Sequence, residues 1–337
     1  MDFYYLVGID TSKGQLDAAV WSEGQIQEQH TLPNEVSAIR KYIKQLRGLK
    51  GFNMSTAVFC LEHTGIYNAH LLKVLHQSKA RIVLIAAVEV QRSLGLQRGK
   101  NDQIDAVRIA TYAARFSDKL RLWEPPRKVI DQLQHLSVLR QRLIKAKVQL
   151  EVPLEEAKEF LDKDNWGPID EHSKEPLEAL TKALERIEHQ IQQLIQQDDQ
   201  LRDQFQRITS IPEVGRVLAS EVLIQTNEFR DFREARKFAC HAGVAPFEHR
   251  SGSSVRGRPR VSHKANKRLK TLLHLSAMAA IRSKNEFQAY YLRKTLDGKN
   301  KMSVLNAVRN KILHRIFAVI RNDTTYQENY QFNFAKP

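Results

Sequence analysis

The spacing of apolar residues changes near residue 126, and this change limits the possible folds more than any other feature of the sequence. Before it, short apolar and β-branched runs alternate with segments of helical spacing. After it, leucines and isoleucines recur every three or four positions as far as residue 206. The first pattern predicts an α/β domain at residues 1–125, and the second predicts long coiled-coil helices at 126–206.

The first domain opens with three short strand-like segments and continues with alternating helices and strands. We expect strands at 4–9, 16–21, 25–30, 56–61 and 81–88, and helices at 35–46 and 69–76. An antiparallel meander followed by this alternation predicts a domain of the ribonuclease-H type. The actin-like and sugar-kinase fold shares the opening Gly-Ile-Asp strand, but it would require further glycine-rich phosphate loops, which the first 120 residues lack.

The middle segment carries apolar residues at the spacing of two long helices. The first helix is marked by Leu136, Leu139, Leu143, Ala146 and Leu150, and the second by Leu177, Leu180, Leu184, Ile187, Ile191, Leu194, Leu201 and Phe205. Residues 165–168 interrupt the pattern. Asp198 occupies one apolar-type position, where a polar residue can set the register of a coiled coil. We expect the helices to pair either within one subunit or between subunits.

Residues 207–323 are predicted to form a mainly α-helical, basic domain, and residues 324–337 a loose polar tail. Between residues 230 and 323 there are 22 Lys and Arg against 6 Asp and Glu, whereas the rest of the chain is almost neutral. This one-sided surplus favours binding to a polyanion such as nucleic acid over a role in solubility alone. The turn at 211–215 resembles a helix-hairpin-helix element, in which a helix N-terminus can bind a phosphate.

The rest of the composition excludes several classes of protein. Two cysteines, Cys60 and Cys240, are too few for a disulfide framework or a four-cysteine zinc site. No apolar run reaches the roughly 20 residues of a membrane helix, and the N-terminus lacks the basic start of a signal peptide. We therefore expect a cytoplasmic protein without a membrane partner.

Four carboxylates fall where a two-metal site would need them. Asp10 and Glu62 each end a predicted strand, whereas Asp102 and Asp105 lie one turn apart at the start of a predicted helix. Carboxylates in this arrangement can hold two Mg²⁺ or Mn²⁺ ions, which activate and stabilise the oxygens of phosphoryl transfer. Taken singly, Asp10 could be a turn residue and Asp102 a helix N-cap.

Two sets of motifs point to one protein family. The N-terminal set is 8–10 (Gly-Ile-Asp), 61–62 (Leu-Glu) and 102–106 (Asp-Gln-Ile-Asp-Ala), and the C-terminal set is 211–215, Phe229, Phe232, 240–246, 251–252, 256–258 and 266–269. In this order, and over most of the chain, they resemble the DEDD transposases of the insertion-sequence family called "one-ten", relatives of the pilin-gene DNA invertases. The chain departs from that family at Lys264-Ala265, where a glycine usually precedes Asn266.

The resemblance implies a bacterial recombinase with an N-terminal RuvC-like metal domain and a C-terminal domain that carries a nucleophilic serine. It also implies a structured noncoding guide RNA that pairs with donor and target DNA. Finally, it implies a homo-oligomer, a dimer or tetramer, joined through the coiled coils. DNA and a guide RNA are therefore the expected partners, and the nucleoid is the expected place of action.

The resemblance assigns the nucleophile to Ser251, the serine that precedes glycine in the matching motif. The chemistry alone leaves Ser253 and Ser254 open, and it also allows all three to act only as hydrogen-bond donors to phosphates. We expect 250–258 to be a flexible basic loop. Seven basic residues of this region are expected to bind nucleic acid: Arg250, Arg256, Arg258, Arg260, Lys264, Lys267 and Arg268.

Three functions compete on these grounds. The first is the recombinase, and the second is a RuvC-type structure-selective nuclease that hydrolyses DNA at the metal site and needs no serine in a basic loop. The third is a nucleic-acid-binding protein with a decayed site, against which the four intact carboxylates argue. Ser251 lies 146 positions after Asp105, and the two predicted long helices lie between them. A helix of about 25 residues spans roughly 37 Å and separates the domains of one chain, so we expect Ser251 to act at the metal site of a neighbouring subunit.

Overall fold

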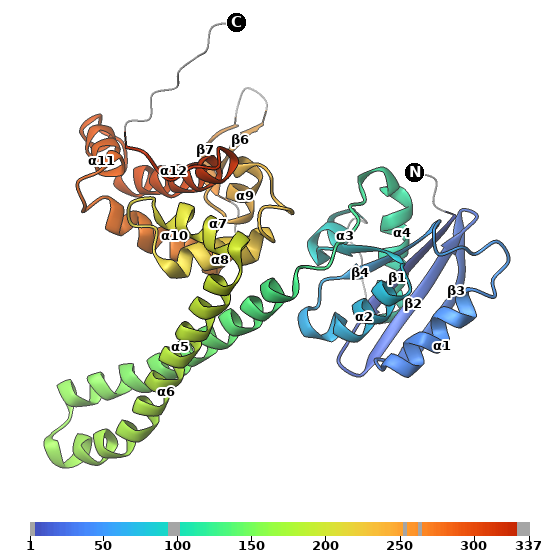
Figure 1. Ribbon diagram of the computed structural model, residues 1–337, viewed down its shortest axis with the longest axis horizontal. Coiled ribbons are helices and arrows are strands. Elements are labelled where there is room, and N and C mark those ends of the chain that lie inside the picture. Colours follow the sequence, from blue (N-terminus) through green and yellow to red (C-terminus); the bar gives the residue numbers. More distant parts are fainter. Residues whose placement is uncertain (1–3, 94–101, 252–254, 262–264, 329–337) are drawn as a thin grey trace, which may run out of the picture. The chain divides into compact units, whose positions relative to one another are not determined.

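The computed structural model describes residues 4–93, 102–251, 255–261 and 265–328. The chain divides into two compact units, Met1–Pro125 and Pro126–Pro337 (Figure 1). Each unit has its own buried apolar core.

A five-stranded mixed sheet forms the centre of the first unit. Its strands are β1 (Tyr5–Thr11), β2 (Gln15–Ser22), β3 (Gln25–Pro33), β4 (Ala57–Glu62) and β5 (Arg81–Ile85). They lie in the order β3-β2-β1-β4-β5. The first three strands form an antiparallel meander, whereas β4 pairs parallel to β1 and β5 pairs parallel to β4. The α/β character predicted for this part of the chain is confirmed.

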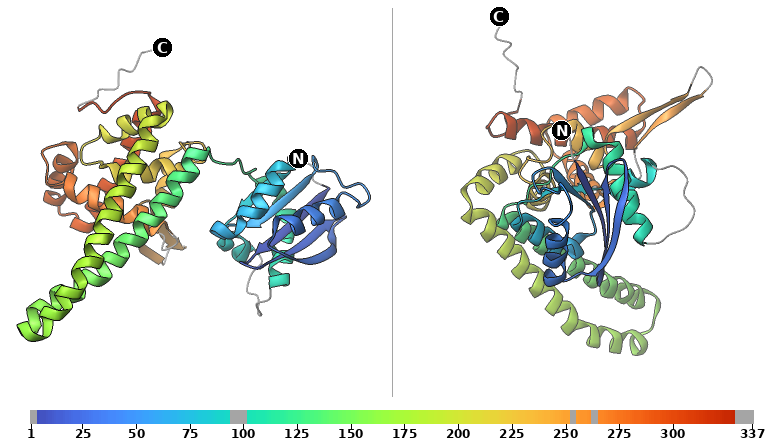
Figure 2. Two further views of the ribbon diagram at one scale, coloured as in Figure 1. Left: turned by 60° about the horizontal axis from the view of Figure 1, so that its bottom comes forward. Right: turned by 90° about the vertical axis from the view of Figure 1, so that its right-hand side faces the viewer.

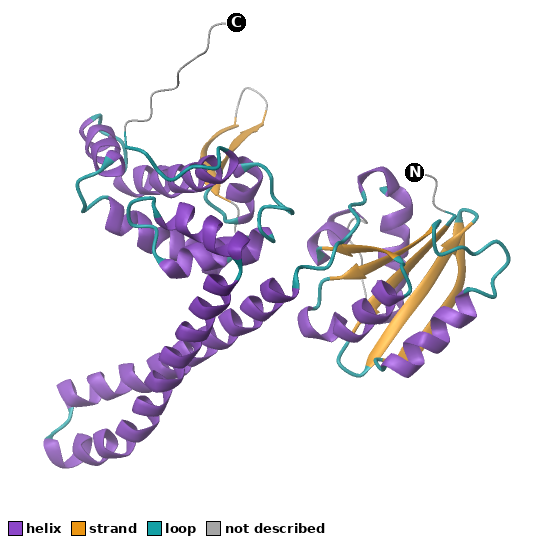
Figure 3. Cartoon of the chain, in the orientation of Figure 1, coloured by secondary structure: helices purple, strands orange, loops and turns teal. Residues whose placement is uncertain are grey.

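Helices cover both faces of this sheet (Figure 3). They are α1 (Val36–Leu46), α2 (Ala69–Gln77), α3 (Ala87–Ser93) and α4 (Asp102–Arg115), with short 3₁₀ turns at Gly65–Asn68 and Ser117–Lys119. On one face, Val7 and Phe59 share a core with α1 and α2. On the other face, Leu6 and Cys60 share a core with Ile109 of α4. The predicted strand at 81–88 is too long, because β5 ends at Ile85 and a helix begins two residues later.

Gly8 of β1 lets α4 lie directly on the sheet. A Cβ atom at this position would stand 2.3 Å from the backbone nitrogen of Ala110 and 2.5 Å from the carbonyl oxygen of Ala106. Ala106, Ala110 and Ala19 of β2 are all buried at this contact. The small residues therefore bring the helix backbone onto the strand backbone, closer than any larger side chain would permit.

Two long helices open the second unit, and they run side by side in both views of the chain (Figure 2). They are α5 (Lys128–Phe160) and α6 (Lys163–Gln197), as the leucine spacing predicts. The break between them lies at 161–162 rather than at 165–168, because Asp162 caps α6 by accepting a hydrogen bond from the backbone N–H of Asn165. Asp198 does not occupy the apolar seam, because it ends α6 and caps the next helix.

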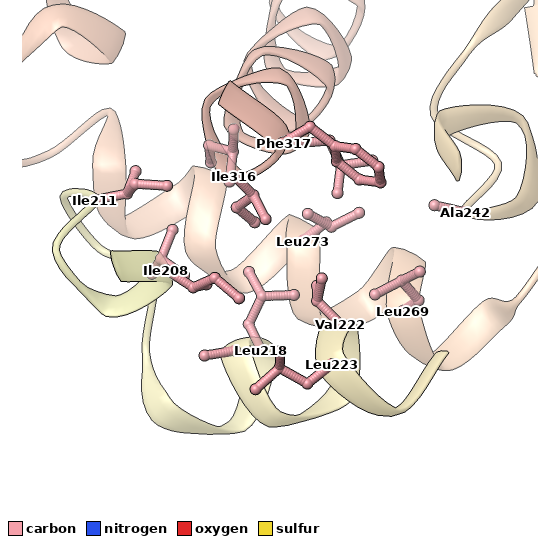
Figure 4. Packing of buried hydrophobic residues seen from close by; sticks show 14 of the residues in the cluster. Ile208, Ile211, Leu218, Val222, Leu223, Ala242, Leu269, Leu273, Ile316 and Phe317 are labelled. Carbon is pink, nitrogen blue, oxygen red and sulfur yellow. The ribbon is translucent and has the colours of Figure 1, made fainter. Parts of the chain in front are cut away.

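Shorter helices pack around a single core in the rest of this unit (Figure 4). They are α7 (Asp199–Thr209), α8 (Arg216–Thr226), α9 (Ala235–His241), α10 (Lys267–Ala280), α11 (Glu286–Leu296) and α12 (Lys301–Arg321). Leu218, Leu273 and Phe317 are among the side chains that meet there. None of the described helices is long and apolar enough to cross a membrane.

An ion-pair network holds the start of α5 against this core. Arg127 donates to both carboxylate oxygens of Asp198 and to both oxygens of Glu228, whose side chain is fully buried. Asn227, Glu228 and Phe229 all adopt positive φ angles at the end of α8. This backbone conformation, unusual for three non-glycine residues in succession, turns the Glu228 carboxylate toward the guanidinium.

A β-hairpin interrupts the helices of the second unit, where we had predicted a flexible loop. Its strands are β6 (Pro246–Ser251) and β7 (Val255–Val261), which pair antiparallel. An arginine occupies every second position of β7, at 256, 258 and 260, which fits a strand. Gly257 and Pro259 between them are depleted in strands, so the sequence favours a loop there.

The contact at Gly8 predicts a large cost for one added methyl group. Gly8→Ala should lower the free energy of unfolding by about 1–3 kcal/mol or more, because the backbone of α4 must move away from β1. Gly14→Ala is the matched control, since a Cβ atom there meets no atom within 4 Å. It should change stability by less than about 0.5 kcal/mol. Urea denaturation followed by tryptophan fluorescence measures both, and equal stabilities would contradict the close approach.

Candidate catalytic site

Asp10 and Glu62 lie side by side at one end of the sheet. Ile9 of β1 is paired with Leu61 of β4 in a parallel register, so the next residue of each strand is one of the two acids. Strand residues two apart share a face, which puts Asp10 on the face of Gly8 and Glu62 on the face of Cys60. Both are on the face that α4 covers.

The first turn of α4 lies over the same end of the sheet. The helix crosses β1 at Gly8 through its second and third turns. Its residue Gln103 donates a 3.3 Å hydrogen bond to the hydroxyl of Thr31 on β3. Thr31 is paired in register with Asp17 on β2, and Asp17 is paired with Asp10. Asp102 and Asp105, on either side of Gln103, therefore belong to the turn that lies over the cross-strand row formed by Asp10, Asp17 and Thr31.

The described side chains do not yet form a metal cluster. The Asp10 carboxylate accepts a 3.0 Å hydrogen bond from the backbone N–H of Thr11, and Asp105 forms a 2.5 Å ion pair with Arg108. Among the side chains that the structure describes, which do not include that of Asp102, no three His, Cys, Asp or Glu residues are grouped to hold a metal ion. Carboxylate oxygens are nevertheless the donors that Mg²⁺ and Mn²⁺ prefer.

Sequence reasoning missed a fifth acid in this row. Asp17 of β2 is only 3% exposed and stands directly opposite Asp10 in the antiparallel pair. Its two carboxylate oxygens accept hydrogen bonds of 2.6 Å from Thr31 and 2.9 Å from Gln15. The signal was available, because an aspartate inside the apolar run at 16–21 is unusual unless it has polar partners.

The predicted nucleophile belongs to the second unit, whereas the four predicted metal ligands belong to the first. Ser251 is the last residue of β6 and pairs with Val255, and Arg250 pairs with Arg256. Arg258 and Arg260 occupy further positions of β7. Ser253, Ser254 and Lys264 lie outside the described residues.

The last two predicted phosphate-binding residues, at the start of α10, differ in environment. Lys267 is exposed to solvent. Arg268 instead donates to the carbonyl oxygen and the hydroxyl of Ser137 on α5, and it forms a 3.1 Å ion pair with the buried Glu221 of α8. Burial lowers the pKa of the Arg268 guanidinium, and the Glu221 carboxylate partly offsets this effect.

Comparisons with known proteins match both units. A DEDD family model of the IS110 type, described as "Transposase", matches residues 7–157, and a model described as "Transposase IS116/IS110/IS902 family" matches residues 205–292. The "Pilin gene-inverting protein" of Moraxella bovis is 26% identical over 332 residues, which cover 96% of this chain and 97% of that protein. The "Transposase for insertion sequence element IS1111A" of Coxiella burnetii is 25% identical and covers 69% of this chain and 70% of its own length.

A Thermus thermophilus RuvC in complex with a Holliday junction substrate matches with a TM-score of 0.28 and 11% identity, over 35% of this chain and 99% of that chain.

Because Lys267 is exposed and Arg268 is paired with a buried carboxylate, replacing each should change the stability of the fold by a different amount. Arg268→Met should lower the free energy of unfolding by about 3–5 kcal/mol, because it leaves the buried Glu221 carboxylate without its cation. Lys267→Met should change stability by less than about 0.5 kcal/mol. Thermal and urea unfolding of the two variants measure the difference. A stable Arg268→Met protein would show that the ion pair contributes little to the fold.

Proposed function

Because the chain belongs to the DEDD transposase family of the IS110 type, we propose that it cleaves and rejoins DNA with a divalent-metal site in its first unit and a serine nucleophile in its second. The observation that carries this proposal is the register of Asp10 and Glu62 beneath the first turn of α4. Cleavage and rejoining of DNA follow from the family. The metal ligands, the serine and the RNA partner are our own assignments.

The topology of the first unit supports a ribonuclease-H or RuvC type of metal domain. Its sheet combines an antiparallel meander with two parallel strands, and β1 lies at the centre. In this arrangement the acid that ends β1 has a neighbour on each side, Glu62 on β4 and Asp17 on β2. A central position of this kind suits a residue that must contact two ions.

The proposed metal ligands are Asp10, Glu62, Asp102 and Asp105. Bound Mg²⁺ or Mn²⁺ would polarise the scissile phosphate and stabilise the charge that develops on its oxygens. To coordinate an ion, Asp105 must exchange its ion pair with Arg108 for the metal. Without a metal, Arg108 limits the repulsion that clustered carboxylates would otherwise suffer.

Ser251 is the proposed nucleophile. Its Oγ would attack the phosphorus of a DNA phosphodiester and lose its proton to a base, while the deoxyribose oxygen leaves. The phosphoserine ester that forms replaces one phosphodiester by another. A second DNA hydroxyl can therefore attack the ester, release Ser251 and rejoin the strands without a high-energy cofactor. Ser251 would reach the metal site of its own subunit or, as we favour, of a neighbour.

A structured guide RNA, together with donor and target DNA, is the proposed set of partners, and the bacterial nucleoid is the proposed place of action. The surplus of 22 basic over 6 acidic residues at 230–323 supports phosphate binding by this part of the second unit. RNA that copurifies with the protein, identified by sequencing, tests the guide.

Self-association into a dimer or tetramer is also proposed, through the tip of the α5–α6 pair. Five large apolar side chains in this part of the two helices are exposed: Val148, Val152, Phe160, Leu161 and Ile169. Such residues are typical of a surface that another protein chain covers.

The carboxylate assignment predicts a loss of both metal binding and activity. Asp10→Asn and Glu62→Gln should each lower DNA cleavage more than about 100-fold, because the loss of a ligand should exceed the 10–100-fold effect of outer partners. Asp118→Asn, at an exposed position of the same unit, is the control. Cleavage of a labelled DNA substrate and Mn²⁺ binding are measured. Full activity in either variant would remove that residue from the site.

The serine assignment predicts a covalent protein–DNA adduct. Wild-type protein, incubated with guide RNA and DNA and then denatured, should yield an adduct detectable by mass, and Ser251→Ala should yield none. Ser253→Ala and Ser254→Ala are the matched controls and should form it. An adduct that survives in Ser251→Ala but disappears in a control would transfer the role to that serine. Recombination without any adduct would favour the hydrolytic nuclease.

A further inference from the structure

A chain of three hydrogen bonds begins at α4 and continues across the strands beneath it. The side-chain amide of Gln103 donates to the Thr31 hydroxyl at 3.3 Å, and that hydroxyl donates to the Asp17 carboxylate at 2.6 Å. The amide of Gln15 donates to the other oxygen of the same carboxylate at 2.9 Å. The chain of contacts therefore runs from a helix through β3 to the strand that faces Asp10.

The direction of these bonds is set by Asp17. An ionised carboxylate can only accept hydrogen bonds, so the single hydroxyl proton of Thr31 must point to Asp17. The Thr31 oxygen can then only accept a hydrogen bond from Gln103. The Gln103 side chain must therefore point its NH₂ group, and not its carbonyl oxygen, toward Thr31. Each group in the chain thus orients the next one.

Asp17 is costly to bury. Its chain neighbours Leu16 and Ala18 belong to the core on the opposite face of the strand, and Ala19, on the face of Asp17, is buried and apolar. A carboxylate removed from water requires hydrogen-bond donors, and here it also faces the carboxylate of Asp10 across the strand pair. An apolar residue at this position would avoid both costs, but it would not orient Thr31.

Gln103 attaches the first turn of α4 to the sheet. The backbone contact with Gly8 lies between Ala106 and Ala110. At a rise of about 1.5 Å per residue, Gln103 lies roughly 5–10 Å away along the helix axis. Ile109 and Ala113 also pack on the sheet, so the middle of the helix is fixed by its core. The Gln103 hydrogen bond extends this attachment to the first turn, between the two acids.

We propose that Asp17, Thr31 and Gln103 are positioning residues that hold the first turn of α4 so that Asp102 and Asp105 can share a metal ion with Asp10. This inference rests on the proposed metal site. It concerns residues that would touch neither the metal nor the DNA. Their effect would be exerted through the orientation of the helix that carries two of the ligands.

Mn²⁺ titration of the full-length protein, followed by electron paramagnetic resonance, tests the inference without relying on activity. Thr31→Val keeps the side-chain shape but removes both hydrogen bonds, and it should raise the Mn²⁺ dissociation constant about 10–100-fold. Thr31→Ser restores the hydroxyl and should bind Mn²⁺ nearly as the wild type does. Gln103→Ala, at an exposed position, should weaken Mn²⁺ binding while leaving the unfolding temperature unchanged. Gln91→Ala, an exposed glutamine of α3, is the matched control and should have no effect.

The outcomes separate this inference from the proposed function. A wild-type protein that binds no Mn²⁺ would overturn the metal site itself. Wild-type affinity in Gln103→Ala and Thr31→Val would overturn the positioning role while leaving the metal site intact. If Thr31→Val does not fold, the Mn²⁺ affinity of Gln103→Ala is the deciding measurement. An unchanged affinity in Gln103→Ala would then overturn the inference. Rescue by Thr31→Ser, together with weak binding in Gln103→Ala, would support it.

Discussion

The contact between α4 and the backbone of β1 at Gly8 determines where the candidate site can form. A single absent Cβ allows the helix to rest on the strand, and the buried alanines on both sides keep the surfaces close. Because the helix crosses β1 only a few residues from its own start, its first turn lies over the ends of β1 and β4. Two acids from strands and two from the helix are thereby assigned to the same edge of the sheet.

Two described acids near Asp10 in the first unit have a cation or hydrogen-bond donors beside them. Asp105 is paired with Arg108, and Asp17 is satisfied by Thr31 and Gln15, so the row of acids around Asp10 does not consist of bare negative charges. The Asp105–Arg108 ion pair is partly buried, and a divalent cation that supplies a stronger charge could replace the guanidinium, whereas the Asp17 carboxylate with its two donors is held in place. The two kinds of acid are therefore suited to different tasks, ligation and support.

Buried ion pairs in the second unit have a different consequence, because they take basic residues away from nucleic acid. Arg127 is bound to Asp198 and Glu228, and Arg268 to Glu221. These pairs fix α5 against α8 and α10, so the long helices start from a rigid base. Of the residues proposed to bind phosphates, Lys267 keeps an exposed position, whereas Arg268 is taken up by the fold. A substitution series that ignored this division would confuse loss of binding with loss of folding.

The sequence by itself determined the five strands and helices α1, α2 and α4 of the first unit, the long helical pair and the placement of Asp10, Glu62, Asp102 and Asp105 near strand ends and at a helix start. These features follow from local periodicity, because alternation and helical spacing record which side of each element is buried. Tertiary structure alone decided that Asp17 faces Asp10, that Gln103 reaches Thr31, that Arg268 turns inward to Glu221 and that 246–261 forms a hairpin. Each of these depends on which elements meet across long stretches of chain. Residue type and spacing within one element carry no information about the partner that another element brings.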